Sequence, residues 1–72
     1  MASTKVESEI SGTVWKLEVQ PGASVSADQV LMVLESMKME IPVESPRAGT
    51  VQQILVNEGE AVSEGQVLLV LA

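Results

Sequence analysis

The sequence predicts an all-β fold, a flattened barrel made of two short antiparallel sheets. Three observations support this prediction. The apolar residues form short Val-rich runs between Gly, Pro, Asn and Ser, which is the pattern of strands. No capping signal opens an apolar stripe of helical period, so no helix is expected. The chain also repeats itself, and the repeat predicts two similar halves.

The repeat becomes visible when the sequence is shifted by 37 residues. Residues 6–35 then align without a gap to residues 43–72, and 15 of the 30 aligned pairs are identical. Two copies suit a single domain built around an approximate twofold axis, which we expect to span residues 1–72, with residues 1–5 flexible. Only residues 36–42 lie between the copies.

The strands follow from the apolar runs. Six are expected at residues 6–10, 13–19, 30–36, 39–43, 50–56 and 67–71, with two short extended segments at 23–25 and 60–62. Residues 30–34 and 67–71 are apolar on both faces, as in strands that are covered on both sides. Closing the two sheets on each other would also limit the exposed edges of these Val-rich strands.

The turns repeat with the strands. The tetrapeptide Gln-Pro-Gly-Ala has Pro second and Gly22 third, the chemistry of a type II turn, whose third residue needs a positive φ. Its counterpart in the second half keeps the glycine, Gly59, and drops the proline. Gly12 and Gly49 open equivalent strands, where we expect a side chain to crowd a neighbouring backbone.

Composition excludes several classes of function. The chain has no His, Cys or Tyr, so Ser-His-Asp and Cys-His catalysis and any His-ligated metal site are excluded, and no metal is expected. Paired carboxylates can act as acid and base. We interpret the candidates as solvated strand and turn charges: Glu7, Glu9, Glu58 and Glu60. The chain is therefore not expected to be an enzyme by itself.

Charge and hydropathy bear on partners and location. Ten acidic and four basic residues give a net charge of −6, which disfavours nucleic acid and anionic membrane surfaces as partners. The longest apolar run, residues 30–34, is far shorter than a membrane span. The first nine residues lack the apolar core of a signal peptide and the arginines of a transit peptide, so we expect a cytoplasmic location.

The segment between the repeats holds the run Glu35-Ser36-Met37-Lys38-Met39-Glu40. Two expected strands meet here with only Met37 and Lys38 between them, which predicts a tight hairpin of type I′ or II′. Such turns prefer Gly, Asn or Asp, and a sequence that breaks a local structural rule is a place to expect function. We expect Lys38 to present its amine for covalent modification by another enzyme. The alternative is a solubilising lysine with both methionines folded back onto the barrel.

Trp15 is the only aromatic residue of the chain, and the repeat aligns it with Gln52. We expect Trp15 to be a half-exposed packing residue, with a contact to a partner as the alternative.

The run from Glu35 to Glu40 is similar to the Glu-Ala-Met-Lys-Met-Glu signature of the biotinyl domain family, the biotin carboxyl carriers of biotin-dependent carboxylases. Residues 11–14, 45–51 and 56–62 resemble strand-opening and turn segments of the family, so the likeness covers roughly residues 6–71. Ser36 stands where the family usually has Ala, and the ungapped repeat has no room for the thumb loop of some bacterial carriers. The family fold is a flattened eight-stranded barrel with quasi-twofold symmetry and the modified lysine at a hairpin tip.

The resemblance implies a carrier domain. A biotin protein ligase would attach biotin to Lys38, a biotin carboxylase would load the biotin with carboxylate, and a carboxyltransferase would pass the carboxyl group on. The resemblance assigns recognition by the ligase and the partners to the neighbours of Lys38, namely Glu35, Ser36, Met37, Met39 and Glu40.

Two alternatives stay open. A lipoyl domain shares this fold and would carry lipoate on Lys38, but it usually has Asp or a small β-branched residue before the lysine and Ala after it. A domain that accepts both cofactors belongs with this alternative. The second is an unmodified interaction module, such as the barrel of an efflux adaptor.

Overall fold

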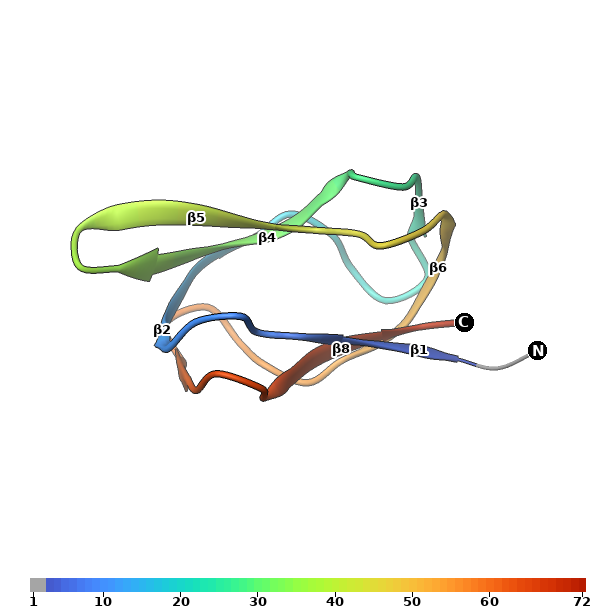
Figure 1. Cartoon of the computed structure of the whole chain (residues 1–72). Helices are drawn as coiled ribbons and strands as arrows, with labels where there is room; N and C mark the ends of the chain where they lie inside the picture. The colour runs from blue at the N-terminus through green and yellow to red at the C-terminus, as the bar shows by residue number, and fades with distance from the viewer. Residues whose placement is uncertain (1–2) are drawn as a thin grey trace.

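A computed structural model describes residues 3–72, and it confirms the all-β prediction (Figure 1). Two four-stranded antiparallel sheets form a flattened sandwich, with strand orders β1-β8-β6-β3 and β5-β4-β2-β7. The strands are β1 (Thr4–Glu7), β2 (Gly12–Leu17), β3 (Ser24–Val25), β4 (Val30–Ser36), β5 (Met39–Glu44), β6 (Gly49–Ile54), β7 (Ala61–Val62) and β8 (Val67–Leu71). Within the described residues, no helix has the length and apolar character needed to cross a membrane.

The sequence repeat is a structural symmetry. A shift of 37 residues turns the order β1-β8-β6-β3 into β5-β4-β2-β7, so each sheet is the counterpart of the other. Backbone hydrogen bonds outside the strand ladders also occur in pairs that are related by this shift. The amide of Ser8 donates to the Gln66 carbonyl at 2.8 Å, and the amide of Ser45 donates to the Gln29 carbonyl at 2.8 Å. The quasi-twofold arrangement is therefore confirmed.

The core lies between the two sheets and draws on both copies of the repeat. Burial of these aliphatic side chains is the main source of stability in a domain that has no disulfide. Most buried positions come in pairs 37 residues apart, so the two halves contribute almost equally. The buried apolar residues are Val6, Val14, Val19, Val25, Leu31, Met32, Leu34, Val51, Val56, Val62, Leu68, Leu69 and Leu71.

The paired turns have the expected geometry. The amide of Ala23 donates to the Gln20 carbonyl at 3.0 Å, and the amide of Glu60 donates to the Asn57 carbonyl at 3.1 Å. The third residues, Gly22 and Gly59, have φ of 92° and 87°. An L side chain would strain the backbone there, which explains why the glycine is retained in both copies while the proline is not.

The first strand differs from the prediction. It was expected at residues 6–10 but runs over Thr4–Glu7, because the Ser8 hydroxyl donates to the Ile10 carbonyl at 2.6 Å and turns the chain out of the sheet. Thr4 and Lys5 were expected to be flexible, but they pair with Leu71 and Val70 on β8. Residues 1 and 2, which share that expectation, lie outside the described residues.

Two other strands end before their predicted positions, and in both the prediction failed for the same reason. β2 and β6 were expected to reach residues 19 and 56, but they end at Leu17 and Ile54. Val19 and Val56 follow in loops and are still buried in the core. Their apolar character reflects core packing from a loop, which a strand pattern cannot distinguish from pairing in a sheet.

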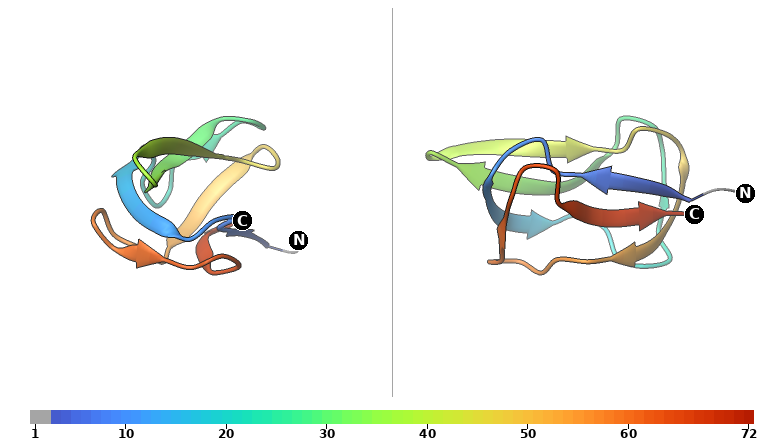
Figure 2. Two further views of the ribbon diagram at one scale, coloured as in Figure 1. Left: turned by 60° about the vertical axis from the view of Figure 1, so that its left-hand side comes forward. Right: turned by 60° about the horizontal axis from the view of Figure 1, so that its bottom comes forward.

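The long axis of the molecule separates the hairpin from the paired chain ends. The domain measures 36 × 18 × 17 Å, and the β4–β5 hairpin projects at the end away from Thr4 and Leu71 (Figures 1 and 2). The pair Thr4 and Leu71 is the repeat counterpart of the pair Ile41 and Leu34 at the hairpin stem. Among the described residues, a hairpin joins β4 to β5 beyond Leu34 and Ile41, whereas no turn joins Thr4 to Leu71.

Candidate functional site

The hairpin tip is the part of the structure that the symmetry does not repeat. β4 and β5 pair as far as Ser36 and Met39, which leaves Met37 and Lys38 as a two-residue turn. Their φ angles are 53° and 65°, and positive values at both central residues identify a type I′ turn. A left-handed conformation costs an L-residue about 1–2 kcal/mol. The tip therefore holds Met37 and Lys38 at positions where a type I′ turn favours Asn and Gly.

Exposure sets the tip apart from the rest of the apolar surface. Met37 is 92% exposed and Met39 is 61% exposed, and Lys38 between them is exposed as well. The alternative in which both methionines fold back onto the barrel is therefore wrong. Thioether side chains are flexible and polarisable and suit adaptable contacts with a partner. The tip presents an amine between two such side chains.

Among the described residues, the charges around the tip leave the amine of Lys38 without an ionic partner. Glu35 and Glu40 are exposed and stand directly opposite each other on β4 and β5, an arrangement that is mildly destabilising for like charges. Over residues 3–72 the only ion pair joins Lys16 and Glu18, at 3.6 Å. In the same stretch no three acidic residues converge as a metal site would require. The Lys38 amine is therefore open to reaction with another molecule.

The hairpin stem is held against the start of β2. The Ser36 hydroxyl donates to the Ser11 carbonyl at 3.1 Å. Gly12 follows, and a Cβ atom on it would lie 2.5 Å from the Glu35 carbonyl oxygen. The hydroxyl of Ser11 in turn accepts a hydrogen bond from the Glu64 amide at 3.3 Å. Ser36, where the resembling family has Ala, thus anchors the strand that carries the tip.

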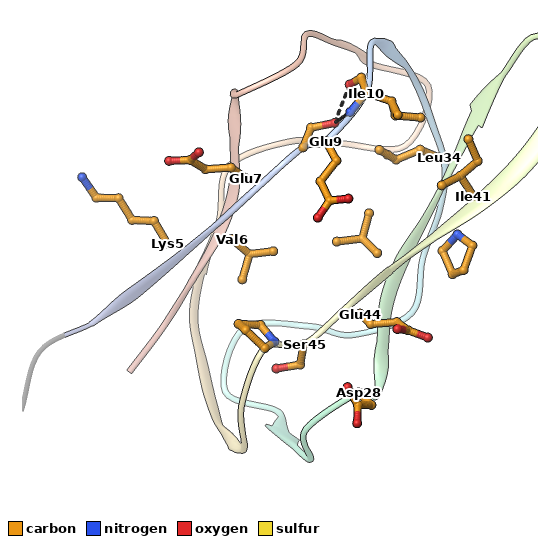
Figure 3. A pocket seen from close by; sticks show the side chains of 14 residues that line it. Lys5, Val6, Glu7, Glu9, Ile10, Asp28, Leu34, Ile41, Glu44 and Ser45 are labelled. Atoms are coloured by element: carbon orange, nitrogen blue, oxygen red, sulfur yellow. Dashed lines mark hydrogen bonds between the residues drawn. The ribbon is translucent and has the colours of Figure 1, made fainter.

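A groove of about 590 Å³ opens between β1 and β5, away from the tip (Figure 3). Its apolar lining includes Leu34, Ile41 and Val43, and Glu7 and Glu9 from the β1 side border it. None of residues 36–40 lines this groove, so it is separate from the hairpin tip.

Glu58 and Glu60, the other two glutamates considered as a possible acid and base, accept hydrogen bonds from backbone amides. A carboxylate oxygen of Glu58 accepts a hydrogen bond from the Leu17 amide at 2.9 Å. A carboxylate oxygen of Glu60 accepts one from the Asn57 amide at 3.1 Å. Both carboxylates therefore stabilise the backbone. The sequence placed these two residues in a turn but did not indicate their hydrogen bonds.

The sequence is similar to that of several known proteins. A family model for Biotin_lipoyl, described as "Biotin-requiring enzyme", matches residues 1–71. The chain is 45% identical over 40 residues to a putative urea carboxylase of Emericella nidulans, covering 56% of the chain and 3% of that protein. It is 42% identical over 38 residues to a biotin/lipoyl attachment protein of Bacillus subtilis, covering 53% of the chain and 52% of that protein. The matches thus span a small part of one relative and about half of the other.

Solved structures give the same picture for the fold. The urea carboxylase of Kluyveromyces lactis matches with a TM-score of 0.94 and 29% identity, over 100% of this chain and 6% of that chain. A single-chain, multi-domain long-chain acyl-CoA carboxylase matches with a TM-score of 0.90 and 34% identity, over 94% and 7%. The lipoyl domain of the 2-oxoglutarate dehydrogenase complex of Azotobacter vinelandii matches with a TM-score of 0.75 and 31% identity, over 86% and 78%.

Proposed function

The chain belongs to the biotin/lipoyl domain family, and we propose that its Lys38 carries covalently bound biotin. The observation that carries the proposal is the placement of the lysine. Lys38 stands at the tip of a strained type I′ turn, between two exposed methionines. The turn projects from the domain, and no acidic group in the described structure pairs with the amine. A modifying enzyme must enclose the Lys38 amine in its active site, so the amine has to be exposed in this way.

The attachment chemistry needs only one group from this chain. The Nζ atom of Lys38 would attack the carboxyl carbon of biotin after ATP has activated that carboxyl group; the amide C–N bond would form as the C–O bond to the ATP-derived leaving group breaks. The ligase supplies the base that accepts the proton from the ammonium group. The product amide is uncharged, so the formal net charge of the chain changes from −6 to −7.

The role that follows is carriage between two active sites. A biotin carboxylase would attach a carboxyl group to the ring, and a carboxyltransferase would remove it to an acceptor. Tethering makes each delivery effectively intramolecular, at a concentration on the order of millimolar for a short flexible link. The carrier itself needs no catalytic residue, which agrees with its lack of His, Cys and Tyr.

Biotin is favoured over lipoate by the residues on both sides of Lys38. Met37 and Met39 match the biotinyl signature, whereas lipoyl domains usually have Asp or a small β-branched residue and Ala in these places.

Intact-mass measurement tests the proposal. The protein is produced in a host that has both a biotin protein ligase and a lipoate ligase, in parallel with the Lys38→Arg variant. We expect the wild type to gain the mass of biotin less one water and to bind avidin, and the variant to do neither. A lipoyl increment without biotin would favour the lipoyl alternative. An unchanged mass in the presence of both ligases would favour the unmodified interaction module.

A further inference from the structure

The outer face of the hairpin sheet carries a row of apolar residues behind the tip. The register of β2 against β4 shifts between Val14 and Lys16, so Trp15 is the extra residue of a β-bulge, and its side chain is 51% exposed. Lys16 pairs with Val33 on β4, and Val33 pairs with Pro42 on β5. We call Trp15, Val33 and Pro42 the tryptophan row.

Strand alternation places this row outside the sandwich. Leu34 is buried in the core, so its neighbour Val33 faces outward, together with its cross-strand partners. Val14 is buried as well, whereas Trp15 directly after it is half exposed. Bulges characteristically redirect a side chain in this way.

The internal symmetry supplies a control for the tryptophan row. Its counterparts on the other sheet are Gln52, Val70 and Lys5. A register shift also falls between Val51 and Gln53, so Gln52 occupies the same bulge as the aromatic residue. The fold therefore does not require Trp at this position. Trp15, Val33 and Pro42 are all apolar, unlike their three counterparts, and Lys16, which pairs with Val33, borders them.

The tryptophan row lies within reach of any protein that encloses the tip. Glu35 and Glu40 form the next pair toward the tip on the same face. Val33 is three residues from the end of β4, about 10 Å at roughly 3.3 Å per residue. An interface of about 600–800 Å² per partner extends about 14–16 Å from its centre. An enzyme centred on the tip that approaches this face therefore reaches the row at the edge of its footprint.

We infer that the tryptophan row is the docking surface for the enzyme that acylates Lys38, an inference that rests on the proposed function. The ligase must bring its active centre to the amine itself and therefore has to bind the surface beside the tip. A carboxylase meets the biotin ring at the end of a longer arm. The ligase surface that fits here has an apolar pocket for Trp15, flanked by basic side chains that face Glu35 and Glu40. Exposed aromatic residues of this kind commonly dominate the energetics of an interface.

Steady-state ligation kinetics with a purified biotin protein ligase, biotin and ATP test the inference. Trp15→Gln installs the residue of the equivalent bulge, and Leu55→Glu is the matched control. Leu55 is 44% exposed, and its repeat counterpart is Glu18. We expect Trp15→Gln to lower kcat/KM for the carrier about tenfold, mainly through KM, and Leu55→Glu to change it less than twofold. Circular dichroism should show both variants folded.

The outcomes separate this inference from the proposed function. If the ligase does not modify the wild type at all, the proposed function fails. If the wild type is modified and both variants react at its rate, or both lose equally, the docking surface is wrong. A loss in Trp15→Gln that is confined to carboxylation of the loaded carrier would assign the row to the carboxylase and overturn the inference.

A binding measurement gives a readout that is independent of turnover. Because Trp15 is the only aromatic residue, incorporation of 5-fluorotryptophan places a single fluorine label on the row. Addition of unlabelled ligase without ATP should shift or broaden that one resonance, and the Lys38→Arg variant should respond in the same way. A resonance that stays unchanged at ligase concentrations that saturate ligation would overturn the inference.

Discussion

The contact between Gly12 and the hairpin stem predicts how a single methyl group would disturb the site. In Gly12→Ala the new Cβ atom would lie 2.5 Å from the Glu35 carbonyl oxygen, about 0.9 Å closer than the 3.4 Å at which ordinary contact begins. Neither atom can rotate away, because the Cβ atom is fixed to the backbone of β2 and the carbonyl oxygen is part of the backbone of β4. The two strands must therefore separate. Overpacking of this kind costs about 1–3 kcal/mol. Loss of the conformational entropy of glycine in the unfolded chain offsets about 0.4–1 kcal/mol. We expect a net loss of about 1–2 kcal/mol.

The repeat provides the matched control, Gly49→Ala. Here the closest atom is Nη1 of Arg47 at 2.7 Å; this side chain donates to the Thr4 hydroxyl and to the Ala48 and Ala72 carbonyls, but it can shift without separating two strands. The next is the Ala72 carbonyl oxygen at 3.1 Å, which has to yield only a few tenths of an ångström. We expect Gly49→Ala to lose less than about 1 kcal/mol after the same entropic offset.

Urea unfolding followed by circular dichroism and by the fluorescence of Trp15 measures both variants. Domains of this size are stable by roughly 0.05–0.15 kcal/mol per residue, so a loss of about 1–2 kcal/mol is a large share of the total. With a slope of about 1 kcal/mol per molar urea, the midpoint of Gly12→Ala should fall by about 1–2 M. A midpoint for Gly12→Ala at or above that of Gly49→Ala would refute the reasoning, because backbone crowding at the stem would then have no energetic consequence.

The tip gives two further predictions. Met37→Asn places a residue that tolerates left-handed φ at the first turn position, so the free energy of unfolding should rise by about 0.5–1 kcal/mol, measured as a higher urea midpoint; a lower midpoint would contradict the strain assigned to the turn. Dilute peroxide should convert Met37 and Met39 to sulfoxides well before Met32, which is 0% exposed, as peptide mass mapping can show. Equal rates at all three would contradict the burial of Met32.

The sequence predicted the architecture well where hydrophobic pattern and turn chemistry agreed. The strands at residues 30–36 and 67–71 were predicted with their observed bounds, because each begins with a continuous apolar run directly after a turn segment. The position and class of the hairpin followed from the two residues left between strands. The first strand was placed wrongly because the hydroxyl of Ser8 ends it through a local hydrogen bond. The pattern of apolar residues does not indicate such a bond.

Contacts between distant segments account for the rest. The bond from Ser36 to Ser11 joins residues 25 apart, and the bond from Leu17 to Glu58 joins residues 41 apart. The bulge at Trp15 was likewise invisible, since the sequence around it reads as uninterrupted strand. These contacts depend on how the two sheets meet, so they become predictable only when the register is known.

The paired ends at Thr4 and Leu71 have a mechanical consequence for a carrier. A polypeptide joined to the domain at either of these residues leaves it at the end opposite Lys38, side by side with the other end (Figure 2). The whole folded body, 36 Å long, then lies between the tether and the cofactor. A small rotation at the tether is amplified into a large displacement of the tip, as in hinged domain motions. The sandwich would thus serve as the stiff outer section of the swinging arm, and Lys38 with the group proposed to be attached to it as only the last, flexible section.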